Sequence, residues 1–490
     1  MKSVRIKNMK SFVDSGDIEI KPITLFVGKN SCGKSSLLRF PAVLGQTFLA
    51  RTDSPLAFFG QFVDYGSFES VKHKGKNDNE EINDISFSVR FDIATNELFD
   101  FYITLDINDE EKNKYISYMG EIADVRIEVT LDKPQKQIKM KEFKVFFNDS
   151  LVASFLREKD DAVYEYKLYK NFTENGIFEL CNSIDLFIES FNYFVPMFDE
   201  EDALNDFEEK ILNENPDISD NELEKYKKTF ENQVEFASGI VREIVDNLYI
   251  NAQCMSYIGP FREDPKRIYR DTENDIRDVG SKGENLSTIL LRESEKDKGM
   301  INQISKWLKK NYGYTLEISP SYSGYFNILL VDENGIKSNI MDVGYGISQV
   351  LPIITQLIRN IYIKNRTFVE NMDEIVLIEQ PELHLHPAAQ ANLAELIAYS
   401  VEAKKSQRIL IETHSEHLIR KLQVLVAKKT YLSPDMLAVY SVEKNNDGQA
   451  IVKKMELNEE GRFLTKWPSG FFDKSHELAS ELRNANSSEV

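Results

Sequence analysis

The chain has 490 residues, of which 42% are hydrophobic and 29% charged, and its formal net charge is −20. This composition indicates a folded protein of about two to four domains and excludes a fibre or a disordered tail. The charge argues against a broad nucleic-acid surface, because affinity for phosphate backbones comes largely from clustered Lys and Arg. We find neither the apolar core of a secretory signal nor a membrane span, so we expect a cytoplasmic protein without membrane contact.

The first segment predicts a strand, a loop and a helix. Residues 22–27 (PITLFV) are apolar and β-rich, and residues 33–40 (GKSSLLRF) have helical character. Between them, residues 28–35 match the pattern G-x-x-x-x-G-K-[ST] of a phosphate-binding loop. Pro41 lacks an amide donor, so we expect the helix to bend or break near it.

The loop pattern gives a chemical role to its residues. Glycines let the loop amides converge on phosphate oxygens, and the helix N-terminus adds a favourable dipole. Lys34 supplies positive charge to the β- and γ-phosphates, and Ser35 can place its hydroxyl on Mg²⁺. We therefore expect ATP and Mg²⁺ to bind through Gly28, Asn30, Ser31, Gly33, Lys34, Ser35 and Ser36.

A long middle segment has a different pattern. Alternating apolar and polar residues separated by polar turns predict an antiparallel β region at 84–170. Residues 199–231 carry 13 acidic side chains against four lysines, which indicates a solvated helical face or linker, with docking of a basic partner as the alternative. We expect three parts: a head segment (1–75), an insertion (76–240; β-rich 84–170, acidic helical 197–240) and a second head segment (241–490).

The C-terminal half returns to an α/β pattern. Residues 315–320 and 325–332 predict a hairpin. The apolar strands EIVLIE (374–379) and RILIET (408–413) flank the helix-like segment 387–403. Strand, helix and strand at this spacing predict a parallel βαβ unit, so the simplest fold is one α/β head split by the insertion.

The end of the first of these strands carries candidate catalytic residues. Glu379 can lie near Mg²⁺ and its water shell as the acidic partner of the phosphate loop. Gln380 follows, where many ATPases have a glutamate base, and a glutamine can orient a water but cannot accept a proton at neutral pH. Hydrolysis would then need Glu382, His414 or a weaker water-positioning mechanism.

Two further clusters have alternative interpretations. His384, His386, His414 and His417 lie within 34 residues. A zinc site is the minor alternative to a structural or nucleotide-linked role, because no cysteine joins them and the H-E-x-x-H spacing is absent. A second group precedes an apolar helical pattern and could approach an anion or simply cap the helix: Gly344, Gly346, Ser348 and Gln349.

The order of these motifs resembles a known family. Phosphate loop, long insertion, DVGYGISQ (342–349), IVLIEQPELHLHP (375–387) and ILIETHSEHLI (409–419) are similar to the ABC-type ATPase heads of the overcoming-lysogenization-defect (OLD) group. That group lies within the wider set of SMC and Rad-type repair ATPases. YIGPFREDPKRIY (257–269) and WPSGFFD (467–473) resemble the ATPase subunits of two-component antiphage systems such as Septu, PARIS and some retrons.

The resemblance implies roles for individual residues. DVGYGISQ would be a signature motif offered to the nucleotide on a partner's phosphate loop, so Gly346 and Ser348 would lie at a dimer interface. LHLHP would be the D-loop at the same interface, and His414 would match the switch histidine that senses the γ-phosphate. A glutamine from the early segment would join the Mg²⁺ shell, and we prefer Gln61 to Gln46 for this role.

Departures from the family limit what is expected of this chain. Gln380 puts rapid turnover in doubt, and the insertion lacks the long heptads of SMC coiled-coil arms. About 75 residues follow THS, so we expect no Toprim nuclease domain and assign nuclease activity to another chain.

Three functions are compatible with these features. The first is an ATPase that dimerises, or forms a higher oligomer, around Mg-ATP through its heads and controls a separate effector, a nuclease of HNH or Toprim type or a toxin, in antiphage defence. The second is a nucleotide-stabilised scaffold with little hydrolysis. The third, ranked last, is a repair-type ATPase that grips DNA through Arg262, Lys266 and Arg267; otherwise we expect any nucleic-acid contact to be indirect.

Overall fold

The computed structural model describes residues 1–50, 52, 54–74, 84–95, 120–134, 136–157, 163–168, 184–187, 190–197, 200–271, 276–296, 298–320, 324–362, 373–467 and 480–481. The chain divides into two compact units. The first comprises Met1–Glu19, Val43–Gly60 and Asp64–Gln253, and the second comprises Ile20–Ala42, Gln61–Val63 and Cys254–Val490. These two units differ from the three predicted parts. The N-terminal residues up to Glu19 were predicted to belong to the head, but they lie with the insertion, because the N-terminal strand pairs with a strand of the insertion.

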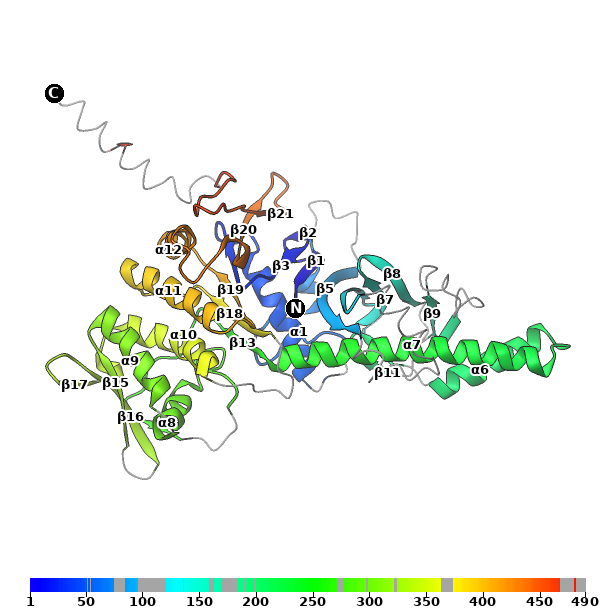
Figure 1. Ribbon diagram of the computed structural model, residues 1–490, viewed down its shortest axis with the longest axis horizontal. Coiled ribbons are helices and arrows are strands. Elements are labelled where there is room, and N and C mark those ends of the chain that lie inside the picture. Colours follow the sequence, from blue (N-terminus) through cyan, green and yellow to red (C-terminus); the bar gives the residue numbers. More distant parts are fainter. Residues whose placement is uncertain are drawn as a thin grey trace. The chain divides into compact units, whose positions relative to one another are not determined.

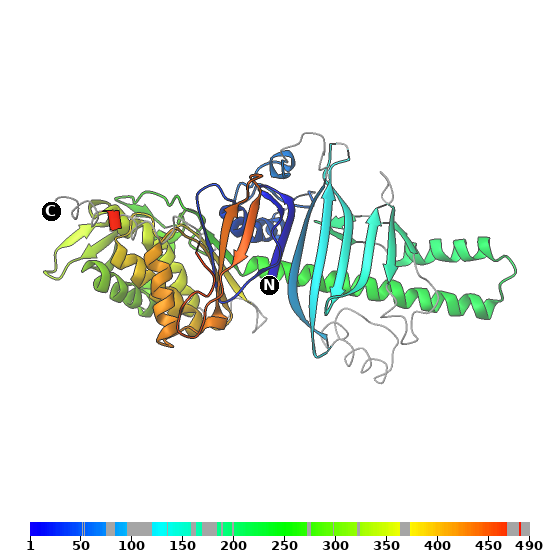
Figure 2. The same ribbon diagram turned by 90° about the horizontal axis from the view of Figure 1, so that it is seen from above.

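An antiparallel sheet forms the centre of the first unit (Figure 2). Its strand order is β10-β9-β8-β7-β6-β5-β1-β2, with β3 paired to β1. The strands are β1 (Ser3–Met9), β2 (Phe12–Asp14), β3 (Ile18–Glu19), β5 (Asp84–Ala94), β6 (Ile122–Asp132), β7 (Lys139–Phe147), β8 (Ser150–Arg157), β9 (Val163–Leu168) and β10 (Ile184–Phe187). Buried and partly exposed residues alternate along β6, as a period-two pattern requires. The predicted antiparallel region is confirmed for this part, and its segment 99–107 lies outside the described residues.

The acidic part of the insertion is helical, as predicted. Helices α6 (Glu200–Glu214) and α7 (Asp220–Gln253) pack against each other (Figure 1). Phe207 stacks on Phe230 with ring centroids 3.9 Å apart, and Lys227 Nζ donates to Glu208 Oε2 at 2.8 Å. The remaining elements of this unit are the short helix α2 (Phe68–Val71) and the hairpin of β11 (Ser190–Asn192) and β12 (Val195–Met197).

A mostly parallel sheet organises the second unit. Its order is β13-β18-β19-β4-β20-β21, in which β21 alone is antiparallel to its neighbour. The strands are β4 (Ile23–Val27), β13 (Met255–Ile258), β18 (Glu374–Glu379), β19 (Gln407–Glu412), β20 (Leu437–Lys444) and β21 (Ala450–Lys454). The predicted parallel pair β18 and β19 is confirmed, and β19 lies between β18 and β4. Residues from the two ends of the chain therefore meet at one sheet edge.

Helices and a second, smaller sheet complete this unit. The helices are α8 (Leu286–Lys296), α9 (Gly299–Tyr312), α10 (Tyr345–Tyr362), α11 (Pro387–Ala403) and α12 (Glu416–Ala427), with short 3₁₀ turns η2 (Ile340–Asp342) and η3 (Pro434–Met436). The smaller sheet contains β14 (Tyr269–Arg270), β15 (Thr315–Pro320), β16 (Tyr325–Val331) and β17 (Lys337–Asn339). Strands β15 and β16 form the predicted hairpin.

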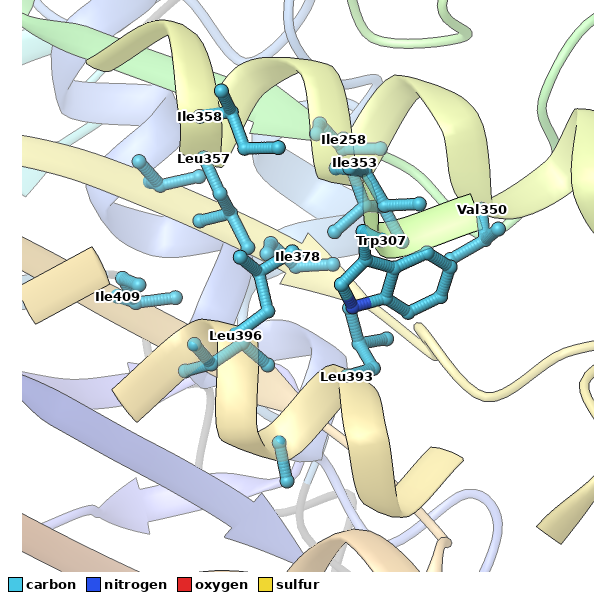
Figure 3. Close-up of a cluster of buried hydrophobic side chains, with 14 of the residues drawn as sticks. Ile258, Trp307, Val350, Ile353, Leu357, Ile358, Ile378, Leu393, Leu396 and Ile409 are labelled. Carbon is cyan, nitrogen blue, oxygen red and sulfur yellow. The ribbon is translucent and has the colours of Figure 1, made fainter. Parts of the chain in front are cut away.

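The core of the second unit is continuous from the parallel sheet to the helices. Trp307 of α9 lies among Val350 and Ile353 of α10 and Leu393 of α11 (Figure 3). Ile378 of β18 is in the same cluster. This apolar layer fixes the strands whose ends carry the candidate catalytic residues.

The expected break at Pro41 is wrong. Helix α1 runs from Lys34 to Leu49 with Pro41 inside it. A proline removes one helical hydrogen bond, but the residues around it, Leu38, Phe40, Ala42 and Val43, are buried. Their packing holds the helix together.

Candidate functional site

The phosphate loop begins where β4 ends. Gly28 has φ 139°, and a Cβ atom there would lie 2.2 Å from the main-chain oxygen of Val442 on β20. Gly33 has φ 109°. Both conformations require glycine, so these two positions let the loop turn tightly from the strand into α1, as the motif predicts.

Lys34 is buried inside the loop, with 3% of its surface exposed. Its Nζ donates to the main-chain oxygen of Lys29 at 2.7 Å and lies 3.8 Å from Glu412 Oε1. Burial lowers the pKa of the Lys34 ammonium. Asn30 and Ser31 are exposed in the loop, and Ser35 and Ser36 stand in the first turn of α1. Phosphate binding by these residues stays a prediction.

Glu379 lies at the end of β18 but is already paired. Arg39 of α1 donates to both carboxylate oxygens at 2.5 and 2.7 Å, and Tyr257 of β13 donates to Oε1 at 2.7 Å. The hydrogen bond to Glu379 raises the pKa of Arg39. Glu379 is buried, so this pairing compensates its charge.

Arg262 holds the main chain at the same strand end. Its Nη2 donates to the carbonyl of Glu379 at 2.8 Å, and its Nη1 lies 3.4 Å from the carbonyl of Gln380. Arg262 is 6% exposed, and burial lowers its pKa to about 10. The expectation that Arg262 contacts DNA is therefore wrong, because its guanidinium points into the protein and its partners are backbone oxygens.

Glu382 is bound through both of its oxygens. Oε2 accepts from Thr413 Oγ1 at 2.8 Å, and Oε1 accepts from the backbone N–H of His414 at 2.6 Å. Burial raises the pKa of Glu382. In this arrangement Glu382 fixes the loop that follows β19 rather than presenting a free carboxylate to a water.

His414 is kept neutral at physiological pH. Burial and the nearby Lys34 lower its pKa to about 4, and its Nε2 is buried without a hydrogen-bond partner among the described residues. A buried nitrogen without a partner is costly. A water or a phosphate oxygen bound there would relieve that cost.

Gln380 occupies a constrained backbone position. Its φ is 44°, and its N–H donates to the main-chain oxygen of Glu412 at 2.8 Å. This bond joins the two loops that leave β18 and β19.

The predicted signature segment lies beside the predicted D-loop of the same chain. A Cβ atom on Gly346 would lie 2.7 Å from the main-chain oxygen of His384, and Tyr345 packs edge-on against the His384 ring. Ser348 is buried and donates to the Tyr345 carbonyl at 2.8 Å, and Gln349 is buried too, whereas Gly344 is exposed. Ser348 therefore binds its own helix in this conformation.

The two glutamine candidates have different environments. Gln61 is exposed. Gln46 is buried, and its amide donates to the Ala57 carbonyl at 2.6 Å. Gln46 thus has a structural role, and Gln61 as a Mg²⁺ ligand stays a prediction.

The histidines do not form a metal cluster. No group of three or more His, Cys, Asp or Glu side chains within the described residues could hold a metal ion. His384 and His417 are exposed, and His386 Nδ1 accepts from the Ala388 N–H at the start of α11. The zinc alternative gains no support. Among the same residues, no helix is both long and apolar enough to cross a membrane.

Sequence reasoning missed three residues of the site, Arg39, Tyr257 and Glu412, and gave Arg262 a different role. Tyr257 and Arg262 both lie in YIGPFREDPKRIY, for which the sequence suggested only a DNA contact. Glu412 ends its buried strand as Glu379 ends the neighbouring one, and the two are paired in register. That repeated pattern was the available signal.

A family model described as an AAA ATPase domain matches residues 1–419. The chain belongs to this ATPase domain family. The predicted α/β class with an inserted β-rich and helical region is confirmed, and the family match confirms an ATPase domain. The ABC type of this head stays a prediction.

A curated relative of this ATPase domain is the retron Ec83 probable ATPase of Escherichia coli, 29% identical over 89 residues. The match covers 18% of this chain and only 16% of the relative's length. Solved structures with similarity include the SMC head domain of Thermotoga maritima, at 9% identity over 93% of this chain and 99% of that one, with a TM-score of 0.38. An Smc head domain from Pyrococcus furiosus is 11% identical over 98% of this chain and 99% of that one, with a TM-score of 0.39. Values this low support no transfer of function.

Proposed function

We propose that this chain binds Mg-ATP, hydrolyses it slowly, and dimerises around the nucleotide to control a separate effector. The convergence of Lys34, Ser35 and His414 at one edge of the parallel sheet carries this proposal. Lys34 would hold the β- and γ-phosphates, and His414 would contact the γ-phosphate or the attacking water. The buried His414 Nε2, which has no hydrogen-bond partner among the described residues, fits a polar ligand at this position.

Binding is tested by substitution inside the loop. Lys34→Ala should weaken ATP binding by about 100-fold, equivalent to about 2.7 kcal/mol, measured by isothermal titration calorimetry. Lys29→Ala is the matched control, because the Lys29 side chain is exposed and only its carbonyl contacts Lys34. Equal affinities for Lys34→Ala and the wild type would refute the proposed site.

We expect slow turnover because neither of the two candidate bases after β18, Gln380 and Glu382, is free to take a proton. Gln380 cannot take a proton, and both oxygens of Glu382 are engaged. Neutral His414 has an unpaired nitrogen that can accept a hydrogen bond from a water. We therefore expect slow phosphate release that is lost in His414→Phe, while ATP binding persists.

The dimer would form through the surface defined by Tyr345, Gly346 and His384. Tyr345 is exposed at this surface although its hydroxyl donates to Asp264, and an exposed aromatic ring suits an interface. ATP should shift the mass of the particle from monomer to dimer in light scattering. The Lys34→Ala variant should stay monomeric, and a wild type that remains monomeric with ATP and its effector would contradict the proposal.

The effector would be a nuclease of HNH or Toprim type, or a toxin, in bacterial antiphage defence. The motif resemblance to the OLD group and the short match to a retron ATPase support this assignment. We place the protein in the cytoplasm on the same grounds. Co-purification with the neighbouring gene's product, and loss of phage protection in Lys34→Ala, would test it.

A non-hydrolysing scaffold is the second candidate, and the engaged carboxylate of Glu382 favours it. Purified protein that retains unhydrolysed ATP and releases no phosphate would support the scaffold over the ATPase. A DNA-gripping ATPase is less favoured, because Arg262 is buried and Arg267 is paired with Asp342.

A further inference from the structure

Glu412 is a buried acid with no role in the mechanism above. It ends β19 and is 3% exposed. Its Oε1 lies 3.8 Å from Lys34 Nζ, and its Oε2 has no hydrogen-bond partner among the described residues. Burial raises the pKa of Glu412, and a hydrogen bond from the Ser35 hydroxyl opposes that rise.

The position of this acid conflicts with phosphate binding unless a cation lies between them. Lys34 is the phosphate-binding ammonium and Ser35 the metal-binding hydroxyl of the loop motif. A carboxylate that contacts both would repel the γ-phosphate strongly in a buried site. A divalent cation bound by Glu412 and the phosphate oxygens would turn that repulsion into attraction.

The neighbouring acid is less available. Glu379 receives two hydrogen bonds from Arg39 and one from Tyr257. Glu412 has Lys34 at 3.8 Å, a hydrogen bond from Ser35 and one oxygen without a partner among the described residues, so it is held by fewer and weaker contacts. Because parallel strands lie about 4.8 Å apart, a metal beside Ser35 can be reached from the end of β19 as well as from β18.

We propose that Glu412 is a carboxylate ligand of the nucleotide-bound Mg²⁺, directly or through one water, together with Ser35. The carboxylate and hydroxyl oxygens suit a hard cation that keeps several waters and takes its other ligands from phosphates. Glu379 would join the metal only after Arg39 releases it. This inference rests on the proposed binding of Mg-ATP.

The test compares ATP affinity with Mn²⁺ and with EDTA, using calorimetry on the full chain, and follows Mn²⁺ by electron paramagnetic resonance. Glu412→Gln should lower the ratio of the ATP affinity with Mn²⁺ to the ATP affinity in EDTA by about tenfold or more. The same variant should bind ATP in EDTA a few-fold more tightly than the wild type, because a negative charge beside the phosphates is gone. General damage to the fold would weaken ATP binding both with Mn²⁺ and in EDTA. It would therefore not produce two changes in opposite directions.

Two further variants make the test decisive. Glu412→Asp keeps the charge and should recover part of the Mn²⁺ dependence, whereas Glu379→Gln should lower the ratio less than Glu412→Gln. An unchanged ratio in Glu412→Gln, or a larger loss in Glu379→Gln, overturns the role of Glu412 while leaving ATP binding intact. A wild type that binds no ATP in either buffer refutes the proposed function itself, and the metal role with it.

Discussion

The two large sheets bury their strands in different ways. Strands β4, β18 and β19 of the parallel sheet are buried almost throughout, whereas β6 of the antiparallel sheet alternates between buried and partly exposed residues. In the parallel sheet, charged groups are confined to the strand ends, where Glu379 and Glu412 lie. In the antiparallel sheet, charges run along the outer face. Strand ends should therefore control ligand binding, and the antiparallel core should control stability alone.

The largest expected effect is in the antiparallel core. Phe143 of β7 is fully buried and packs against Phe155 with ring centroids 6.1 Å apart. Phe143→Ala should lower the free energy of unfolding by about 3–5 kcal/mol because it leaves a cavity. Urea denaturation measures this loss. Lys141→Ala, on the exposed face of the same strand, is the control and should change stability by less than about 0.5 kcal/mol; similar losses in both would contradict the comparison.

An intermediate effect is expected at the parallel strand ends. Arg39→Ala leaves the buried Glu379 without its cation, which should cost about 2–3 kcal/mol, less than for a fully buried pair because Arg39 is 32% exposed. The measurement is again denaturant unfolding. Arg39→Lys keeps the charge but loses the two-pronged contact, so it should cost less. If Arg39→Ala and Arg39→Lys both lower the free energy of unfolding only slightly and by the same amount, the pair of Arg39 and Glu379 does not stabilise the strand end.

The smallest effect is a pH dependence from His414. Its pKa is about 4 in the folded chain and about 6.5 when unfolded, so the unfolded state binds the proton first as pH falls. Stability should therefore drop by about 1–2 kcal/mol between pH 6.5 and pH 4, a value reduced because the ring is partly exposed. His414→Gln should remove this slope, measured by unfolding at several pH values, while His417→Gln on the exposed side should leave it. A slope that survives His414→Gln belongs to other groups.

Local patterns predicted much of this structure. The strand, phosphate loop and helix at 23–49, the hairpin at 315–331 and the βαβ unit at 374–412 depend on residues that are close in sequence. The pairing of β1 with β5 could not be predicted, because strands 80 residues apart carry no local signal of their partner. The continuation of α1 through Pro41 depends on tertiary packing, which outweighs the proline's local preference.

The candidate site was predicted only in part, for a similar physical reason. The motifs and the family resemblance named Lys34, Ser35 and His414, and the structure places them just after the ends of β4 and β19. The pairing of Glu379 with Arg39 joins residues 340 positions apart, so the sequence predicted a metal-binding and catalytic role for Glu379 and did not indicate its arginine partner. Glu412 lies beside the phosphate loop because β19 is between β18 and β4, and a local sequence pattern does not show that strand order.

The contact between Gly346 and His384 has a consequence for assembly. The absence of a side chain at 346 lets the start of α10 rest on the backbone of the loop before α11. Any side chain at 346 would meet that backbone, so the start of α10 and the loop before α11 would have to separate. A surface built from both segments would then lose its shape, even though neither segment had changed its own fold.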